Sequence, residues 1–353
     1  MQNLQDSKKL MLDFQQDMQN ASAETVGDVL AKYVSDDYEF FGVHPFNRLQ
    51  GAEAVAAKLW KPLYEAWEPL QRRQDIFIAG INTVTTEELS RMDGEITPDQ
   101  EGDVWVMSMG HFLGLRDKPW LGIPATRKMG FLRYAEFNCV RNGKIVRTGF
   151  FCDIIDVMTQ AGINPLPLQT GASFMYPGPR THDGLLFDAQ DPQEAVNTVN
   201  LLNRMIADLT EQNDNPDGRC PPEVLERTWH KDMIWYGPEG IGASYTIPRY
   251  QEQHQYPFRE NLKDKVFNGH VSRFAEGNYA CFFGWPNLSN TPTGGLMGLP
   301  ASDVKADMRV VDVYRRDGDK LAENWVLIDI PYWLLQQGLD ILNRTESITL
   351  IQS

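Results

Sequence analysis

Two stretches of the chain share a pattern of identical residues at the same spacing. Residues 121–163 read LGIPATRKMGFLRYAEFNCVRNGKIVRTGFFCDIIDVMTQAGI, and residues 297–339 read MGLPASDVKADMRVVDVYRRDGDKLAENWVLIDIPYWLLQQGL. A constant offset of 176 residues aligns identical residues along both, including Pro124 with Pro300 and Asp153 with Asp329. Because no gap is needed over the whole stretch, the chain is predicted to contain two tandem copies of one fold. A function of the repeated unit therefore has two candidate sites.

Composition indicates an ordinary globular protein. The chain has 353 residues, of which 42% are hydrophobic and 11% aromatic, and a net charge of −15. That length is enough for two domains that each bury a core. The acidic balance argues against a nucleic-acid partner and against an anionic membrane, since both require basic surfaces. We interpret the acidity as serving solubility.

Cysteine usage and the chain ends point to a soluble, cytoplasmic protein. Four cysteines are present without any CxxC pair, so neither a zinc knuckle nor a redox motif is predicted. The first residues lack the pattern of a signal peptide, and no apolar run is long enough to span a membrane. Phosphate-loop, dinucleotide and metal-protease motifs are absent, and the histidines lack metal-ligand spacing. The expectation is no metal and no cofactor.

Each half opens with amphipathic helices and closes with strands, which predicts an α+β class. The expected organisation is a first domain over residues 1–165, a Pro/Gly-rich linker over 166–190 and a second domain over 191–353. Pro62 is expected to kink a helix or end its first part, and the repeat aligns it with Pro257 in the second copy. Hairpin turns are predicted at Asn142-Gly143 and Asp317-Gly318.

An insertion distinguishes the first copy. Its early segments align with the second copy at an offset of 195, about 19 residues more than the later segments. The acidic segment 87–103, EELSRMDGEITPDQEGD, is the natural position for these residues. It is predicted to form a long hairpin loop.

The carboxyl end of each copy resembles the SnoaL-like polyketide cyclase family. The residues that carry the resemblance are the LGIPAT segment, an Arg-bearing strand, the Asn-Gly or Asp-Gly turn, and ENWVLIDIPYWLLQQGL from Glu323. That family belongs to the nuclear-transport-factor-2-like superfamily. The resemblance implies two tandem cone-shaped α+β barrels, each with N-terminal helices packed on a curved antiparallel sheet. It also implies an acid/base Asp, which matches Asp329 in copy two and Asp153 in copy one. Copy one departs from the pattern, with Arg147 and Gly149 where the family has Glu and Trp.

Asp153 and Asp329 lie in apolar strand ends, FFCDIID and VLIDIPY. An aspartate that faces the cone interior loses hydration, so its pKa rises toward the range useful for proton transfer. The alternative is that each caps the helix that follows. Arg133 and Arg309 recur at matched strand positions, either beside the aspartate or, more simply, on the outer face of the sheet.

Further candidates differ between the copies. Copy one has His44 and His111, either of which could form a proton relay with Asp153 or be a structural histidine. The candidate substrate-binding residues belong to copy two, where the alternatives are core packing or a domain interface. They are Tyr236, Glu239, His254, Trp285 and Trp325.

The predicted function is cofactor-independent acid/base catalysis on a small, largely apolar carbonyl or hydroxyl compound. Cyclisation, isomerisation, dehydration and hydrolysis all fit, because the fold alone does not select a reaction. The alternative is a non-catalytic small-molecule-binding or assembly module made of two fused cones. Expected partners are a small-molecule substrate and the pairing of the two domains, with a homo-oligomer as a further alternative.

Overall fold

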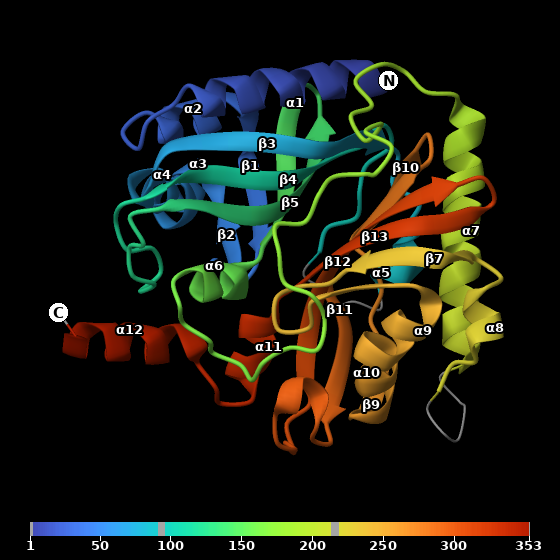
Figure 1. The fold of residues 1–353 in the computed structure, drawn as a ribbon. Coiled ribbons are helices and arrows are strands. Elements are labelled where there is room, and N and C mark those ends of the chain that lie inside the picture. Colours follow the sequence, from blue (N-terminus) through green and yellow to red (C-terminus); the bar gives the residue numbers. More distant parts are fainter. Residues whose placement is uncertain (1–2, 91–95, 213–218, 353) are drawn as a thin grey trace.

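The computed structural model describes residues 3–90, 96–212 and 219–352 and contains two cone-shaped α+β units (Figure 1). The first unit is a six-stranded sheet of order β2-β1-β6-β5-β4-β3, in which β1 runs parallel to β6 and the other neighbours are antiparallel. The strands are β1 (Val34–Gly42), β2 (Arg48–Gln50), β3 (Trp67–Gly80), β4 (Val104–Arg116), β5 (Met129–Arg141) and β6 (Lys144–Cys152). The helices are α1 (Leu4–Gln19), α2 (Val26–Tyr33), α3 (Gly51–Val55), α4 (Lys61–Ala66), α5 (Thr86–Leu89) and α6 (Ile154–Gln160).

The second unit repeats the plan with a seven-stranded sheet of order β10-β11-β12-β13-β7-β8, and β9 pairs with β11. The strands are β7 (Trp229–Tyr236), β8 (Ala243–Tyr245), β9 (Leu262–Phe267), β10 (Ser272–Glu276), β11 (Tyr279–Pro292), β12 (Ala306–Asp317) and β13 (Lys320–Ile328). The helices are α7 (Pro192–Glu211), α8 (Pro222–Leu225), α9 (Ile247–Tyr250), α10 (Tyr256–Glu260), α11 (Ile330–Gln336) and α12 (Ile341–Gln352). The predicted α+β class and the tandem of two cones are confirmed.

Proline produces the same helical irregularity in both units. A π-helical turn, Ala56–Trp60, precedes Pro62, and another, Gln251–Gln255, precedes Pro257. Proline lacks an amide donor, so the regular hydrogen-bond ladder cannot continue through it, and the wider turn accommodates the gap. The helix of the first unit is thus irregular at Pro62, as the sequence predicts, and the second unit has the same irregularity at Pro257.

Both predicted hairpins are present. Asn142-Gly143 joins β5 to β6, whereas the turn between β12 and β13 is formed by Gly318 and Asp319, one residue later than predicted, because Asp317 pairs with Lys320 as the last residue of β12. The acidic segment joins β3 to β4, which pair as an antiparallel hairpin; residues 91–95 of this segment lie outside the described residues.

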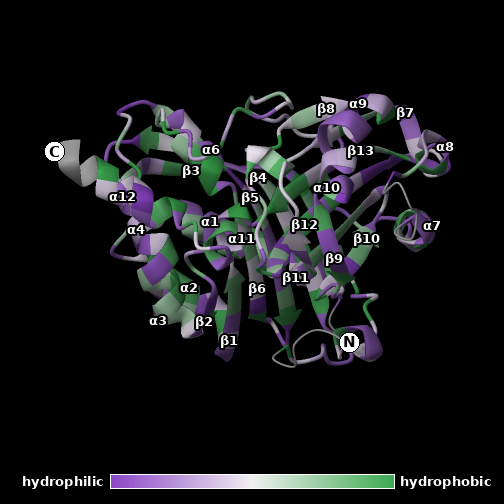
Figure 2. Ribbon diagram, turned by 90° about the horizontal axis from the view of Figure 1, so that it is seen from below, coloured by the Kyte–Doolittle hydropathy of each residue, from purple (hydrophilic) through white to green (hydrophobic). Residues whose placement is uncertain are grey.

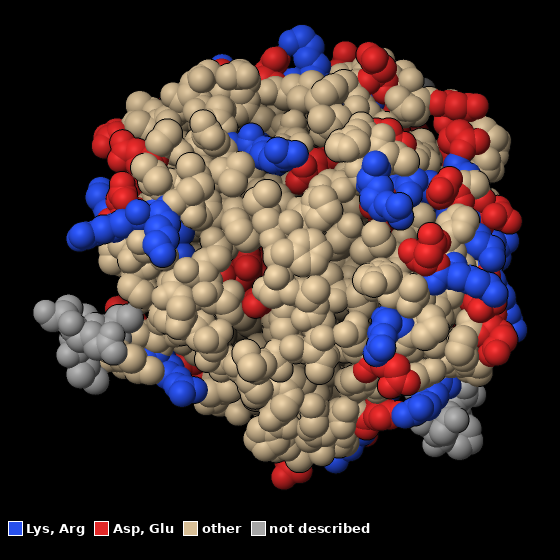
Figure 3. Space-filling model, in the orientation of Figure 1, with Lys and Arg blue, Asp and Glu red and all other residues tan. Residues whose placement is uncertain are grey.

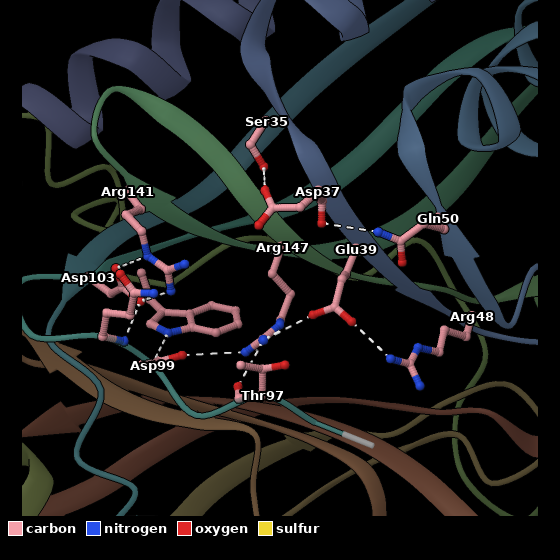
Figure 4. A network of polar contacts seen from close by, with 12 residues as sticks. Ser35, Asp37, Glu39, Arg48, Gln50, Thr97, Asp99, Asp103, Arg141 and Arg147 are labelled. Atoms are coloured by element: carbon pink, nitrogen blue, oxygen red, sulfur yellow. Dashed lines mark hydrogen bonds and ion pairs between the residues drawn. The ribbon is translucent and has the colours of Figure 1, made fainter. Parts of the chain in front are cut away.

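The described part of the acidic segment is held against the sheet by ion pairs (Figure 4). Arg147 contacts Asp99 at 3.4 Å and Glu39 at 3.1 Å, and Arg141 contacts Asp103 at 2.6 Å. Arg147 lies at the position that Glu323 has in copy two. In copy one this arginine anchors the acidic segment to the sheet.

The two sheets pack against each other in the middle of the molecule, with α1–α4 on one side and α7 on the other (Figure 2). The Phe283 ring inserts between aromatic side chains of the first unit. Its centroid lies 5.7 Å from that of Phe151 and 5.8 Å from that of Phe137. A Cβ on Gly149 would lie only 2.8 Å from the Phe283 ring, so the missing side chain at this position makes room for the neighbouring domain.

The segment between the units packs on both of them. Phe77 of β3 donates its amide to Gly184 at 2.8 Å, and Ala172 forms a bridge with Ala243 of β8. At the carboxyl end, α12 reaches back to the first unit (Figure 1), where Glu346 lies beside Gly122. Among the described helices, none combines the length and apolarity that crossing a membrane requires.

Candidate functional site

Asp153 lies at the contact between the two units. It caps α6 by accepting from the Asp156 amide at 3.2 Å, and it forms a buried ion pair with Arg133. Its second oxygen accepts from the backbone amide of Glu239, in the other unit, at 2.8 Å. Arg133 also donates to the carbonyl of Gly237 at 3.2 Å. The carboxylate therefore joins the domains while it caps its helix.

Asp329 repeats this arrangement in the opposite direction. It caps α11 through the Tyr332 amide at 3.1 Å, pairs with Arg309 at 3.1 Å and accepts from the His44 amide of the first unit at 2.8 Å. Burial raises the pKa of Asp329 to about 6, although Arg309 and the amides of His44 and Tyr332 act to lower it. The two contacts are related by the sequence repeat, so each cone holds the other through the same group.

These contacts correct one expectation about geometry. Asp153 and Asp329 are directed toward the neighbouring domain and not toward the interior of their own cones. Arg133 and Arg309 lie on the outer faces of the sheets, where they are buried because the other domain covers them. The helix-capping alternative describes both aspartates, and a role for them in proton transfer stays a prediction.

Two further carboxyls surround Asp153. Burial, followed by the charge of Asp153, raises the pKa of Asp156 to about 8. Burial also raises the pKa of Glu239, which accepts from the Ser173 hydroxyl at 2.9 Å. Acidic side chains are visible at the bottom of a hollow near the centre of the face in Figure 3. Glu239, predicted to bind substrate, belongs to the domain contact because its backbone amide donates to Asp153.

The two candidate histidines of copy one do not meet Asp153. His44 follows β1, and burial lowers the pKa of its imidazole. His111 lies within β4, as predicted, and its Nδ1 is 3.2 Å from the Asp75 carboxylate. The expected relay between a histidine and Asp153 is therefore not formed, because these strands direct the two rings elsewhere.

Three of the candidate aromatic residues lie on the outer face of the second sheet. Tyr236 stacks on Trp325, with centroids 5.4 Å apart, and the Trp325 indole donates to the Pro177 carbonyl at 3.1 Å. Trp285 covers the Arg309 guanidinium at 4.1 Å. These contacts match the interface alternative for this set.

His254 is the candidate that lies inside the second cone. Its ring stacks on Trp235 at 4.0 Å, next to Tyr250 and Phe258. Burial lowers its pKa to about 3, so the imidazole is neutral at physiological pH.

A cavity of about 220 Å³ opens among the helices and strands of the second cone. Most of its wall is apolar, with polar groups from Arg259, Lys265, His270 and Tyr314. The wall consists of Met205, Ile206, Leu209, Thr210, Phe258, Arg259, Lys265, Phe267, His270, Phe282, Asn287, Leu288 and Tyr314. Such a wall suits a small apolar ligand with one or two polar groups.

Asp312 lies behind this wall and is the functional candidate that the sequence reading missed. Its Oδ1 accepts from the Tyr314 hydroxyl at 3.1 Å and from the Asn324 amide at 3.0 Å. Burial raises the pKa of Asp312 to about 7, against the lowering effect of Asn324 and Tyr314. No cation contacts it within the described residues. The offset of 176 pairs Asp312 with Glu136, and this recurring acid is the sequence signal that could have revealed it.

The first cone has a different interior. Glu136 pairs with Arg72 at 2.6 Å, and Ser108 contacts the Tyr134 hydroxyl at 2.9 Å. The Arg72 guanidinium also lies over the Tyr134 ring at 4.8 Å. A hydrogen-bonded polar cluster thus fills the position that corresponds to the Asp312 region of the second cone.

One group of potential metal ligands occurs in the described ranges: Asp99, Asp103 and Cys139. Both carboxylates already pair with arginines, Asp99 with Arg147 and Asp103 with Arg141. Burial keeps the pKa of the Cys139 thiol well above its ordinary value, which disfavours the thiolate that metals bind. These groups therefore fit an anchoring role better than a metal site.

No family model matches this chain, and no curated protein sequence matches it. Solved structures with a similar shape include a candidate SnoaL-like polyketide cyclase from Jannaschia sp. CCS1, 19% identical over 38% of this chain and 76% of that one, with a TM-score of 0.26. Another is AclR, a candidate hydroxylase from Streptomyces galilaeus, 15% identical over 41% of this chain and 97% of that one, with a TM-score of 0.32. A third is an NTF2-like protein from Burkholderia thailandensis, 18% identical over 42% of this chain and 95% of that one, with a TM-score of 0.28. Each of these matches spans about two fifths of the chain.

Proposed function

We propose that the second cone catalyses cofactor-independent acid/base chemistry on a small, largely apolar carbonyl or hydroxyl compound. The observation that carries the proposal is Asp312, a buried carboxyl with a pKa of about 7 that hydrogen-bonds to a tyrosine of the cavity wall. A group with a pKa near the working pH is present in both protonation states, which is what proton transfer in both directions requires.

Tyr314 connects the carboxyl to the cavity. When Asp312 is ionised, a substrate hydroxyl donates its proton to the Tyr314 oxygen while the Tyr314 proton passes to Asp312 over the 3.1 Å contact. In the reverse direction protonated Asp312 returns a proton through Tyr314 to a carbonyl or leaving oxygen. Each transfer conserves protons and needs no further reactant. The same relay serves isomerisation, dehydration and cyclisation, and it serves hydrolysis when a water molecule takes part as the second reactant.

The cavity limits the size of the substrate. An engineered apolar cavity of about 150 Å³ holds benzene, so the 220 Å³ of this site suits a compound with one ring. The volume favours isomerisation or dehydration of such a compound over the closure of a multi-ring polyketide.

The first cone supplies a matched control. Glu136 occupies the same strand position as Asp312, but its partner is the Arg72 guanidinium at 2.6 Å. An acid paired with a permanent cation is poorly suited to exchange protons with a ligand. The proposal therefore assigns catalysis to the second cone.

The experiment is a turnover screen with single-ring ketones and hydroxy compounds, followed by Asp312→Asn and Tyr314→Phe on the best substrate. Removal of a general acid/base lowers turnover by about 10²–10⁴-fold, and Glu136→Gln, although it breaks a buried ion pair, is expected to leave turnover per folded molecule within a factor of two. In the wild type kcat/KM should bend near pH 7, and this bend should disappear in Asp312→Asn. Unchanged turnover in Asp312→Asn would contradict the assignment.

The same screen tests the sequence-based assignment of the proton carrier to Asp153 or Asp329. Asp153→Asn and Asp329→Asn are expected to reduce stability more than turnover per folded molecule, because both residues join the domains. If these variants lose turnover while Asp312→Asn retains it, the proton carrier is Asp153 or Asp329 at the domain contact. A compound that binds in the second cone without turnover would favour the binding-module alternative.

A further inference from the structure

A separate cavity of about 390 Å³ lies between the linker and the outer edge of the first sheet. Strands β3 and β4 form one wall, and the linker between residues 175 and 185 forms the other. The wall consists of Arg73, Gln74, Asp75, His111, Met175, Tyr176, Pro177, Gly178, Pro179, Arg180, His182, Gly184 and Leu185. None of these residues belongs to the interior of the second cone.

The sheet brings a row of basic side chains to this place. Arg73 of β3, His111 of β4 and Arg133 of β5 are direct cross-strand neighbours, so their side chains share one face. Asp75 is the extra residue of a bulge between Gln74 and Ile76, and such bulges redirect a side chain. Its carboxylate contacts Arg73 Nε and His111 Nδ1, both at 3.2 Å.

The imidazole of His111 is incompletely satisfied. The residue is 3% exposed, and its Nε2 has no hydrogen-bond partner within the described residues. A carboxylate on Nδ1 fixes the tautomer, so Nε2 either accepts a hydrogen bond or, in the imidazolium, donates one. The Nε2 atom is closed to solvent, so His111 meets the cavity through other parts of its ring and serves as a reporter of what binds there.

The linker is fitted closely over this Asp75–His111 pair. A Cβ on Gly178 would lie 2.9 Å from the Asp75 Cβ, and a Cβ on Gly184 would lie 2.4 Å from the Asp75 carbonyl oxygen. The linker therefore approaches the bulge only because it carries glycine at both positions. In the second domain Trp285 covers Arg309, the counterpart of Arg133.

We propose that this cavity binds a small carboxylate with an apolar body. The Nη atoms of Arg73 and the guanidinium of Arg180 have no hydrogen bond or ion pair within the described residues, and both side chains line the cavity. Guanidinium groups match the two oxygens of a carboxylate. Met175, Pro177, Pro179 and Leu185 supply the apolar part of the wall.

The charges around the cavity agree with an anionic ligand. Two arginines and two histidines face one carboxylate, Asp75, which already contacts Arg73 and His111. A bound carboxylate takes the unused donors of Arg73 and Arg180, next to the Asp75–His111 pair.

The test follows the imidazole NMR signals of the full-length protein during titration with benzoate. The His111 signals report on the linker cavity, while those of His270, in the wall of the second-cone cavity, report on the other site. We expect a saturable shift of the His111 signals, with affinity at least tenfold weaker in the Arg73→Gln, Arg180→Gln double variant. Both arginines are exposed, so this variant should fold normally.

Two probes of related chemistry sharpen the result. Benzyl alcohol has the same body without the charge and should bind at least tenfold more weakly than benzoate. Inorganic phosphate has the charge without the body and should also bind more weakly. Equal binding of either probe, a shift confined to His270, or a linear shift of all histidine signals would overturn the proposal. Binding in this cavity does not depend on catalysis in the second cone. Asp312→Asn should therefore leave the response of the His111 signals to benzoate unchanged.

Discussion

The substitution Asp312→Asn separates the ionisation of this residue from its hydrogen bonds. Both contacts, from the Tyr314 hydroxyl and the Asn324 amide, end on Oδ1, which asparagine retains. In the folded protein the pKa of Asp312 is about 7, whereas its ordinary value is 3.8. Between these values the folded state keeps the proton and the unfolded chain has lost it. The unfolded state then binds fewer protons, so the wild type loses stability as pH rises through this window.

The magnitude follows from the shift of the pKa. Each pKa unit corresponds to about 1.36 kcal/mol, so the shift from 3.8 to about 7 makes the full effect roughly 4 kcal/mol. About two units of this range lie between pH 5 and pH 7, and above pH 7 the effect is constant. From pH 5 to pH 8 the wild type should therefore lose about 3 kcal/mol relative to Asp312→Asn.

The assay is urea unfolding followed by tryptophan fluorescence at steps from pH 5 to pH 8. The control is Asp37→Asn, an exposed residue whose pKa is lowered by the Ser35 hydroxyl (Figure 4). Asp37 is ionised throughout this range, so the control should run parallel to the wild type. A difference between wild type and Asp312→Asn that stays constant from pH 5 to pH 8 would refute the raised pKa, and with it the main support for the catalytic proposal.

Further substitutions test the contact between the domains. Gly149→Ala places a Cβ 2.8 Å from the Phe283 ring and should cost about 1–3 kcal/mol of unfolding free energy. Its control is Gly27→Ala in α2, where the nearest neighbour of the new Cβ lies at 3.6 Å, and this variant should be more stable by up to about 1 kcal/mol. Equal effects of the two substitutions in urea unfolding would contradict the packing. Asp153→Ala and Asp329→Ala each leave a buried arginine unpaired and should cost about 3–5 kcal/mol, and a loss below about 1 kcal/mol in either would contradict its role as a domain anchor.

Local sequence patterns predicted the elements and their connections well. Asn142-Gly143 and Asp317-Gly318 mark hairpins because Asn142, Gly143 and Gly318 adopt the positive φ that tight turns require. Pro62 and Pro257 mark irregular helices because proline removes an amide donor. These rules act within a few residues, so they do not depend on what packs against the element.

The candidate site was predicted less well, for a geometric reason. An aspartate at the end of an apolar strand has the same sequence environment whether it faces a cone interior or a second domain. Asp153 and Asp329 face the second domain, whereas Asp312, in the middle of β12, faces the interior. The resemblance to a family with an active-site aspartate matches the first two residues and does not include the third.

The sequence by itself determined that this chain contains one α+β fold twice, since a repeated pattern of strands, turns and helix caps specifies the same local structure wherever it occurs. Only the tertiary structure decided which face of each sheet lies against the other domain. That choice depends on contacts between residues more than a hundred positions apart, such as Gly149 with Phe283. Burial on one face made anchors of Asp153 and Asp329, and burial on the other gave Asp312 a pKa of about 7.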